Sequence, residues 1–290
     1  MEDQALVEVA LGSTAIFAFV AYTMQRRSAL INIVFLVVVV AAFCVFTVRS
    51  NKSLLDIPAI LFLRVFDGSD HRDCLLLFWS ICVLSSFIFC TVVGASDSTS
   101  TTHRKFFHLT VSLICLTGLR YDVEFTWLSA WLVLCIFMIV EIFRSLKVPP
   151  WSTYLDNWLL VFVDSQDSKD LILTPIFLVA GIFLPLFLSP ISNYEKRHLY
   201  HYGGVMTVGV GDSAAAIFGS RYGTHHWPES SKSKEGTAAM VFAQILFGIL
   251  LCITYIPDCM LTLFSILRLA LTCTVCAFVE AHIKKIDNIA

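Results

Sequence analysis

The chain has 290 residues, of which 57% are hydrophobic and only 14% are charged, and its mean hydropathy is +0.78. A soluble domain of this size could not cover its surface with so few polar groups, so the composition indicates an integral membrane protein. The formal net charge of −2 argues against a nucleic-acid partner held by bulk positive charge.

Apolar runs of about 20 residues, the length that crosses a bilayer as a helix, recur along the whole chain. The predicted spans are 5–24, 29–48, 74–94, 106–119, 125–143, 171–189, 199–218, 237–255 and 260–280. Two shorter segments, 54–66 and 151–163, carry charge or tryptophan at their edges and are predicted to lie at the interface. We therefore expect an all-α integral membrane protein, a polytopic helical bundle of about nine transmembrane helices plus short interfacial helices.

Neither the cysteines nor the histidines form a pattern typical of crosslinks or zinc sites. The ten cysteines stand singly within apolar runs, as Cys44, Cys82 and Cys115 do, without CxxC spacing or a disulfide framework. They are therefore expected to be small buried hydrophobic side chains. His225 and His226 are adjacent, and no cysteine pair accompanies them at ligand spacing, so zinc is not expected.

The first polar group of interest opens the predicted span 106–119. Arg104 and Lys105 precede this span and His108 lies within it. A basic flank that fixes the orientation of a helix explains the first two. A histidine satisfied by local hydrogen bonds explains His108, although this side chain can also act as a base.

Carboxylates stand near the ends of the next two spans. Glu141 lies three residues before Arg144, a spacing typical of an ion pair within one helix. Asp164 and Asp167 are also three residues apart, just before a span. They could share Mg²⁺, which prefers few protein oxygens plus substrate phosphates, and a solvated loop is the equally good alternative.

The most informative stretch is 203–236, where a glycine-rich apolar segment carries Asp212. A carboxylate at that depth in lipid is costly, so it needs a compensating partner such as a metal ion. The small residues Gly211, Ala215, Gly219 and Gly223 recur every fourth position, which is typical of close helix packing. Glycine before Asp212 also permits an opened backbone whose N–H groups bind phosphate.

A short polar loop then leads into the next apolar run. Ser233 as N-cap and Glu235 in the first turn predict a helix start. The same helix end can bind an anion, and Lys232 would add a point charge for a phosphate. Near the end of the last run, Glu280 has no simple structural explanation.

The predicted spans also place these polar groups relative to the bilayer. Two spans separate each group from the next, so all of them are expected on one face of the membrane. That face carries more of the Lys and Arg residues, and the positive-inside rule makes it cytosolic.

Taken together, these residues resemble the dolichol kinases, the polyprenol kinase family that is related to phytol kinases and phosphatidate cytidylyltransferases. The similar stretches are RKFFH (104–108), VDSQDS (163–168), VGVGDSAAAIFGSRYG (208–223), WPESSKSKEGT (227–237) and EAHIKKIDN (280–288). The resemblance implies that transmembrane helices in 1–100 precede a catalytic membrane domain in 101–290. Family members usually carry more spans before this domain and continue beyond it.

The resemblance also implies an activity. CTP would donate its terminal phosphate to dolichol, giving dolichyl monophosphate for protein glycosylation in the endoplasmic reticulum membrane, with the site facing the cytosol. The expected partners are a polyprenol or dolichol, CTP and membrane lipids, without nucleic acid, and the expected cofactor is Mg²⁺ or another divalent cation.

Roles for individual residues follow from the same resemblance. Asp212, Lys232 and Glu235 would be catalytic, and Asp164, Asp167 and Asp212 would bind the metal. The residues expected to contact CTP are Met206, Val208, Gly209, Val210, Gly211, Asp212, Ser213, Gly219, Ser220, Arg221, Lys232 and Ser233. Further candidates are Arg104, Lys105, His108, Glu141, Glu280, Asp287 and Asn288.

Two alternatives use the same residues differently. A cytidylyltransferase would join CTP to a lipid phosphate, giving a CDP-lipid and pyrophosphate. A cation-coupled transporter would use the acid within the membrane to bind its ion, and broken helices suit that class. Transporters usually show two matching halves, which this sequence lacks.

Overall fold

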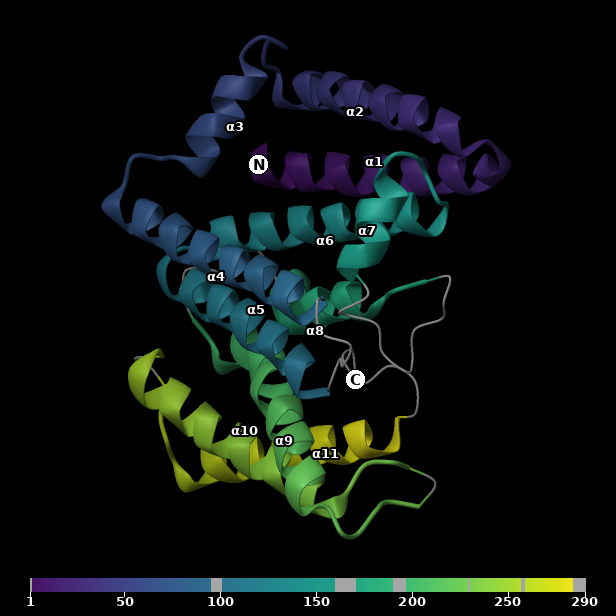
Figure 1. Ribbon diagram of the computed structural model, residues 1–290. Coiled ribbons are helices and arrows are strands. Elements are labelled where there is room, and N and C mark those ends of the chain that lie inside the picture. The colour runs from purple at the N-terminus through teal and green to yellow at the C-terminus, as the bar shows by residue number, and fades with distance from the viewer. Residues whose placement is uncertain are drawn as a thin grey trace. The chain divides into compact units, whose positions relative to one another are not determined.

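The computed structural model describes residues 2–94, 101–159, 171–189, 197–228, 230–256 and 259–283. Within these ranges every regular element is a helix, as the composition predicts (Figure 1). The elements are α1 (Glu2–Thr23), η1 (Gln25–Arg27), α2 (Ser28–Ser50), α3 (Ile57–Val65), α4 (Asp70–Gly94), α5 (Thr101–Tyr121), α6 (Val123–Ser145), α7 (Trp151–Leu159), α8 (Thr174–Leu188), η4 (Leu199–Tyr202), η5 (Val205–Gly211), α9 (Asp212–Tyr222), α10 (Lys234–Thr254) and α11 (Leu263–His282).

The helices match the predicted spans closely, and the protein is a multi-pass membrane protein. Within the described ranges, six helices are long and apolar enough to cross a bilayer: α1, α2 together with η1, α4, α6, α10 and α11. Helix α8 is shorter, and the predicted span 199–218 is divided among η4, η5 and α9. The total of nine spans therefore stays a prediction. The two predicted interfacial segments form the short helices α3 and α7.

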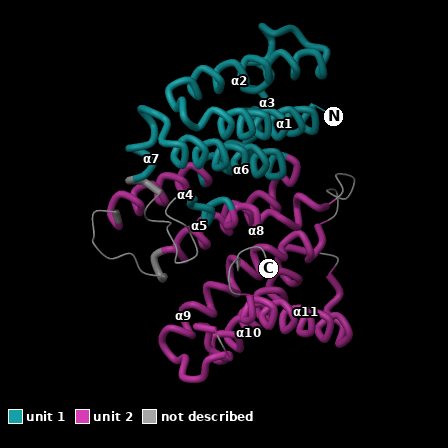
Figure 2. Tube along the Cα trace, turned by 90° about the vertical axis from the view of Figure 1, so that its right-hand side faces the viewer, with its two compact units in different colours: residues 1–78, 125–176 teal, residues 79–124, 177–290 magenta. Residues whose placement is uncertain are grey.

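The chain forms two compact units, each built from two separate stretches of sequence (Figure 2). Unit 1 comprises residues 1–78 and 125–176, and unit 2 comprises residues 79–124 and 177–290. These units do not follow the functional boundary at residue 100, and that boundary stays a prediction.

In unit 1, α1 and α2 lie side by side (Figure 1). The rings of Phe17, Phe35 and Phe143 pack against one another with centroids 5.2–5.5 Å apart. Aromatic rings at these separations attract each other in edge-to-face or tilted geometry, in addition to the apolar area that they bury. Ile31 and Val148 complete this core, and both are fully buried.

Unit 1 also contains the Glu141 network. The predicted pair within α6 forms, because Arg144 Nη2 lies 2.6 Å from Glu141 Oε1 and both side chains are 6% exposed. Arg144 Nη1 also contacts Asp156 of α7 at 3.2 Å, and Glu141 Oε1 accepts a hydrogen bond from the backbone N–H of Ile172. Each group thus has a hydrogen-bonded partner, which a buried charge requires. Glu141 is a structural residue here.

In unit 2, α10 packs against both α9 and α11, and η5 contacts α5, α9, α10 and α11 (Figure 1). Helices α10 and α11 are antiparallel, since Lys232, just before α10, reaches Glu280 near the end of α11. The segment η5–α9 therefore lies within the unit, where α5, α10 and α11 contact η5 and can position its residues.

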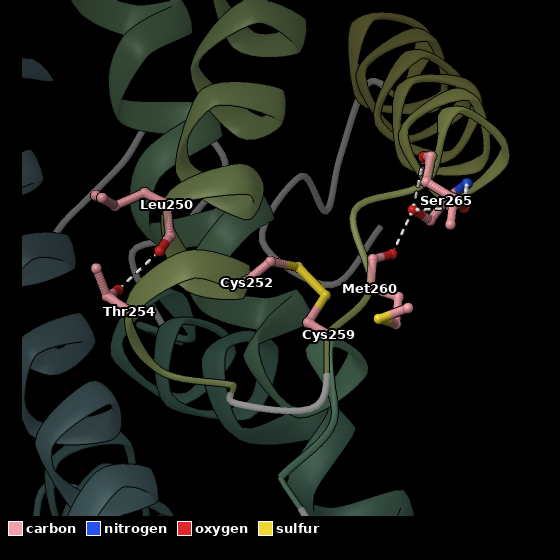
Figure 3. The surroundings of a disulfide bond; sticks show 7 residues. Leu250, Cys252, Thr254, Cys259, Met260 and Ser265 are labelled. Carbon is pink, nitrogen blue, oxygen red and sulfur yellow. Dashed lines mark hydrogen bonds between the residues drawn. A yellow bond between two sulfur atoms is a disulfide. The ribbon is translucent and has the colours of Figure 1, made fainter.

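A disulfide corrects the prediction that the cysteines form no crosslink. Cys252 in the last turn of α10 is bonded to Cys259 in the connection to α11, with Cα atoms 5.2 Å apart (Figure 3). The two cysteines are seven positions apart in the sequence, a spacing from which the crosslink was not predicted. Of the other cysteines, Cys82, Cys115 and three more are buried as expected, whereas Cys44 is exposed on α2.

Candidate functional site

The residues before Asp212 form a π-helix. Seven residues, Val205–Gly211, adopt this wider winding, and α9 begins directly afterwards at Asp212. A π-helical segment within a helix is rare and is found frequently at functional sites. The sequence predicted one span over 199–218, but the observed break gives Asp212 a direction that a continuous α-helix would not.

Glycine allows η5 to approach three different helices closely. A Cβ atom on Gly204 would collide with the backbone carbonyl of Ile182 in α8, and one on Gly209 would collide with the Ser112 hydroxyl of α5. A Cβ atom on Gly211 would lie 2.5 Å from Gln244 Nε2 of α10. The glycine-rich sequence thus fixes η5, and with it Asp212, between α8, α5 and α10.

Asp212 points to the first turns of α5. Its Oδ2 atom forms an ion pair with Lys105 and lies 3.1 Å from His108 Nε2. The three side chains are largely buried, with exposed fractions of 15% for Asp212, 13% for Lys105 and 4% for His108. We name this group the Asp212 cluster. Two basic side chains, Lys105 and His108, thus compensate the cost of burying this carboxylate.

His108 contacts both its own helix and Asp212. Its Nδ1 atom lies 3.0 Å from the backbone carbonyl of Arg104, one turn earlier on α5, and its Nε2 atom lies 3.1 Å from Asp212 Oδ2. One carboxylate thus faces two basic side chains, Lys105 and His108.

The small residues of α9 form the packing face that their spacing predicts. A Cβ atom on Gly219 would lie 3.0 Å from Ser233 Oγ, and one on Gly223 would lie 2.7 Å from the same atom. A Cβ atom on Gly236 would lie 2.9 Å from the backbone oxygen of Ala215. These contacts hold the N-terminus of α10 against α9, so the interpretation of the pattern as close helix packing is confirmed.

The predicted helix start is also confirmed. Ser233 Oγ accepts a hydrogen bond of 3.1 Å from the backbone N–H of Gly236, the geometry of an N-cap. The side chain of Glu235 turns back to the preceding loop, where it accepts a hydrogen bond from Thr224 and lies 2.7 Å from His225 Nδ1. These contacts tie the Glu235 carboxylate to the loop before α10.

Lys232 and Glu280 form an ion pair. Lys232 Nζ donates to Glu280 Oε1 at 2.6 Å and to the backbone oxygen of Glu280 at 2.8 Å. Glu280, for which the sequence offered no structural reason, therefore ties the loop before α10 to the end of α11. Lys232 points to α11, not to Asp212.

Within the described residues, the Asp212 cluster and the Lys232–Glu280 pair lie in the same unit without direct contact. Asp212 begins α9, and Gly219, which contacts the N-cap of α10, follows seven residues later. At 1.5 Å per residue, Asp212 and Gly219 are separated by about 10 Å along the axis of α9. An extended ligand such as a nucleoside triphosphate can contact both, whereas a single ion cannot.

The remaining predicted residues have varied surroundings. On η5, Met206, Val208 and Gly209 are buried, and on α9 Ser213 Oγ donates to the Gly209 carbonyl. Ser220 and Arg221 are exposed. Contact of these residues with CTP stays a prediction, as it does for Val210. The residues predicted outside the described ranges are Asp164, Asp167, Asp287 and Asn288.

Two kinds of residue escaped the sequence analysis. Thr224 and His225 hold Glu235, and the adjacent histidines were weighed only as zinc ligands. Gln244 of α10 is fully buried beside Gly211. A glutamine in the middle of an apolar span was the available signal, because an intramembrane polar residue usually has a function.

The described ranges contain no cluster of three His, Cys, Asp or Glu side chains that could hold a metal ion. Mg²⁺ is often bound by only one or two carboxylates together with substrate phosphates, so Asp212 alone is compatible with such a site. Lys105 and His108 both contact the Oδ2 atom of the Asp212 carboxylate.

Curated dolichol kinases of several eukaryotes are similar in sequence to this chain. That of Homo sapiens is 34% identical over 203 residues, which cover 65% of this chain and 38% of the human protein. An Arabidopsis thaliana dolichol kinase is 29% identical over 231 residues, or 77% of this chain and 39% of that protein. The Saccharomyces cerevisiae dolichol kinase is 26% identical over 236 residues, or 80% of this chain and 43% of that protein.

This chain is thus homologous to dolichol kinases over most of its own length, and the resemblance predicted from the motifs is confirmed. It spans about two fifths of the length of these relatives. No family model matches the chain. No solved structure matches it either.

Proposed function

We propose that this chain acts as a dolichol kinase, transferring the terminal phosphoryl group of CTP to the hydroxyl group of dolichol. The observation that carries the proposal is the Asp212 cluster, a largely buried group of one carboxylate and two basic side chains at the end of a π-helix. The chain that contains it is similar to the human dolichol kinase over 65% of its length. Phosphoryl transfer requires mainly positioning and neutralisation of charge, which such a cluster supplies.

Lys105 and His108 would bind phosphate oxygens of CTP. Both basic side chains already face a carboxylate in a largely buried site, where electrostatic interactions are stronger than in water. Asp212 is the anion that holds both in place before the nucleotide arrives. Preorganised charges of this kind need little rearrangement during the reaction.

The N-terminus of α10 would bind the other end of the triphosphate. The positive end of the helix dipole favours an anion there, whereas the N–H groups of Lys234, Gly236 and Thr237 already donate to His225 and Ser233. Lys232 adds a charge at this helix end, and Glu280 restrains it. Glu235 holds the loop through Thr224 and His225, which makes it a positioning residue.

A divalent cation belongs to the proposal as a partner of the phosphates. Asp212 is the described carboxylate that would hold it, with Asp164 or Asp167 as further candidate ligands. Bound Mg²⁺ would neutralise the charge that develops on the phosphate oxygens.

In the proposed reaction, the alcohol oxygen of dolichol forms a bond to the γ-phosphorus of CTP. The bond between that phosphorus and the β–γ bridging oxygen breaks, and CDP leaves with the electron pair. The proton of the alcohol passes to a carboxylate of the site. The products are CDP and dolichyl monophosphate.

We place the site on the cytosolic face of the endoplasmic reticulum membrane. The Cys252–Cys259 disulfide lies at the end of α10 opposite Ser233, and disulfides persist in oxidising compartments such as the lumen of this organelle. In sealed microsomes, a membrane-impermeant amine reagent should therefore modify the exposed Lys234. Modification of Lys234 only after permeabilisation would contradict this orientation.

The position of the transferred label tests the proposed reaction. The purified chain would be incubated with Mg²⁺ and CTP labelled at either the γ- or the α-phosphate, with dolichol or dolichyl phosphate as acceptor. We expect the γ-label to enter the lipid fraction with dolichol, and the α-label to stay in water with both acceptors. Transfer of the α-label to dolichyl phosphate, with release of pyrophosphate, would identify a cytidylyltransferase instead.

A further inference from the structure

Unit 2 contains a cavity beside η5. Its volume is about 620 Å³, and it is lined by residues of α8, η4, η5, α10 and α11. This volume falls within the usual range of sites for small organic molecules, about 300–1,000 Å³. None of its lining residues belongs to the Asp212 cluster.

The cavity wall is mostly apolar. Leu184 of α8, Met206 and Val208 of η5, and Leu269 of α11 contribute aliphatic or thioether side chains. Such a lining would bind an aliphatic chain by excluding water from both surfaces. A triphosphate, by contrast, would lose its hydration against this mostly apolar wall, where Arg268 is the permanently charged side chain among the lining residues.

One lining residue is polar, fully buried and unsatisfied. Gln244 is 0% exposed, and neither its Nε2 nor its Oε1 atom has a hydrogen-bond partner within the described structure. A buried amide without partners destabilises the folded state, because it does not regain the hydrogen bonds that it makes with water in the unfolded chain. A ligand that offers both a donor and an acceptor would remove this cost.

Gln244 of α10 also lies against the residue that precedes Asp212. Its carboxamide lies against Gly211, where only glycine leaves room for it, and Gly211 directly precedes Asp212. A ligand group bound to this carboxamide would therefore lie close to the backbone that carries Asp212.

We propose that this cavity binds the hydroxyl-bearing end of the isoprenoid alcohol, with the Gln244 carboxamide hydrogen-bonded to the hydroxyl. The assignment rests on the proposed function, because it names the place of the acceptor in that reaction. A hydroxyl group donates one hydrogen bond and accepts others, as the carboxamide requires. The aliphatic chain would occupy the apolar part of the cavity, and the rest of a long polyprenol would continue into the bilayer.

Helix α11 offers a matched pair of positions for a test. Thr272 lines the cavity, whereas Thr274 does not. Both are exposed, and each hydroxyl donates to a backbone oxygen four residues earlier, at 2.9 Å and 2.8 Å. Thr272→Trp would fill the cavity, and Thr274→Trp would add the same side chain outside it.

Kinetics with dolichol and CTP give the first readout. We expect Thr272→Trp to raise the KM for dolichol about tenfold with the KM for CTP unchanged, and Thr274→Trp to change neither. Gln244→Leu should also raise the KM for dolichol about tenfold, since a bound hydroxyl would lose its partner. Its Tm should not fall, because the variant removes a buried unsatisfied amide. A lower Tm with an unchanged KM would show a purely structural Gln244.

Photo-crosslinking gives a readout that does not need activity. An isoprenoid alcohol with a diazirine near its hydroxyl end should label the α11 peptide that contains Thr272 in the parent, and not in Thr272→Trp. Labelling elsewhere, or equal competition by a phospholipid without the alcohol, would overturn the assignment. If the parent is labelled on α11 but phosphorylates no isoprenoid alcohol, the proposed function fails and the cavity assignment stands. If the parent phosphorylates dolichol and both Trp variants behave alike, the cavity assignment fails and the proposed function stands.

Discussion

Each compact unit contains a buried group of opposite charges around one carboxylate, Glu141 in unit 1 and Asp212 in unit 2, and these two groups differ in construction. In unit 1, Glu141 and Arg144 are three residues apart on α6, and the guanidinium of Arg144 faces a second carboxylate, Asp156. In unit 2, Asp212 meets Lys105 and His108 from a helix more than 100 residues earlier, and one carboxylate faces two basic side chains. The first group is local and has two carboxylates for one basic side chain. The second is assembled by the fold and has one carboxylate for two basic side chains.

The difference indicates which buried ion pair is a candidate for chemistry. A pair at helical spacing with all its atoms engaged serves the fold, and removing one partner mainly affects stability. A cluster with two basic side chains for one carboxylate, at the end of a π-helix, can bind a further anion, so removing one of its members should mainly affect binding or catalysis.

The largest expected effect concerns a cation of the Asp212 cluster. Lys105→Met should lower the rate of phosphoryl transfer from CTP about 100-fold, because a preorganised positive charge near the phosphates is lost. Lys52→Met is the matched control, since Lys52 is half-exposed and pairs loosely with Glu2 at 3.6 Å. Initial rates of both purified variants check the prediction. Equal rates for the two would remove Lys105 from the mechanism.

The reverse outcome is expected in unit 1. Glu141→Ala should lower the free energy of unfolding by about 3 kcal/mol, because it leaves the buried Arg144 without its closest partner. Activity per folded molecule should stay within about threefold of the parent. Glu8→Ala, which breaks an exposed pair with Arg49, should change stability by less than about 1 kcal/mol. Thermal and denaturant unfolding measure both variants, and an unchanged Glu141→Ala would refute the structural role.

A smaller effect distinguishes two glycines, one in each unit. Gly236→Ala should destabilise the protein by about 1–2 kcal/mol and raise the KM for CTP, because its Cβ would lie 2.9 Å from the Ala215 oxygen. Gly12 of α1 has nothing within 4 Å of such a Cβ, so Gly12→Ala should stabilise by about 0.5–1 kcal/mol through helix propensity. A shift of Tm in the same direction for both variants would contradict the close packing of α9 on α10.

Most of the fold follows from the sequence because the length of an apolar run is a local property. The predicted spans 5–24 and 237–255 differ from α1 and α10 by at most three residues at either end. The N-cap at Ser233 and the packing face of α9 are likewise local patterns. The break at η5 was missed, because nothing in the periodicity distinguishes π-helical from α-helical winding over seven residues.

The site could be predicted only in its parts. Asp212, Lys105 and Lys232 were each singled out by charge and depth, but their partners were not. The pairing of Asp212 with α5, and of Lys232 with Glu280, depends on which helices are neighbours. The disulfide between Cys252 and Cys259 and the orphaned amide of Gln244 depend on tertiary structure in the same way.

The central claim is that the carboxylate at the start of α9 organises a phosphate-binding cluster. The most direct measurement is the single-turnover rate of γ-label transfer from CTP to dolichol by the purified parent and by Asp212→Asn, a change that keeps size and shape. We predict a loss of at least about 100-fold per folded molecule. A rate within a few-fold of the parent would show that the chemistry lies elsewhere in the chain.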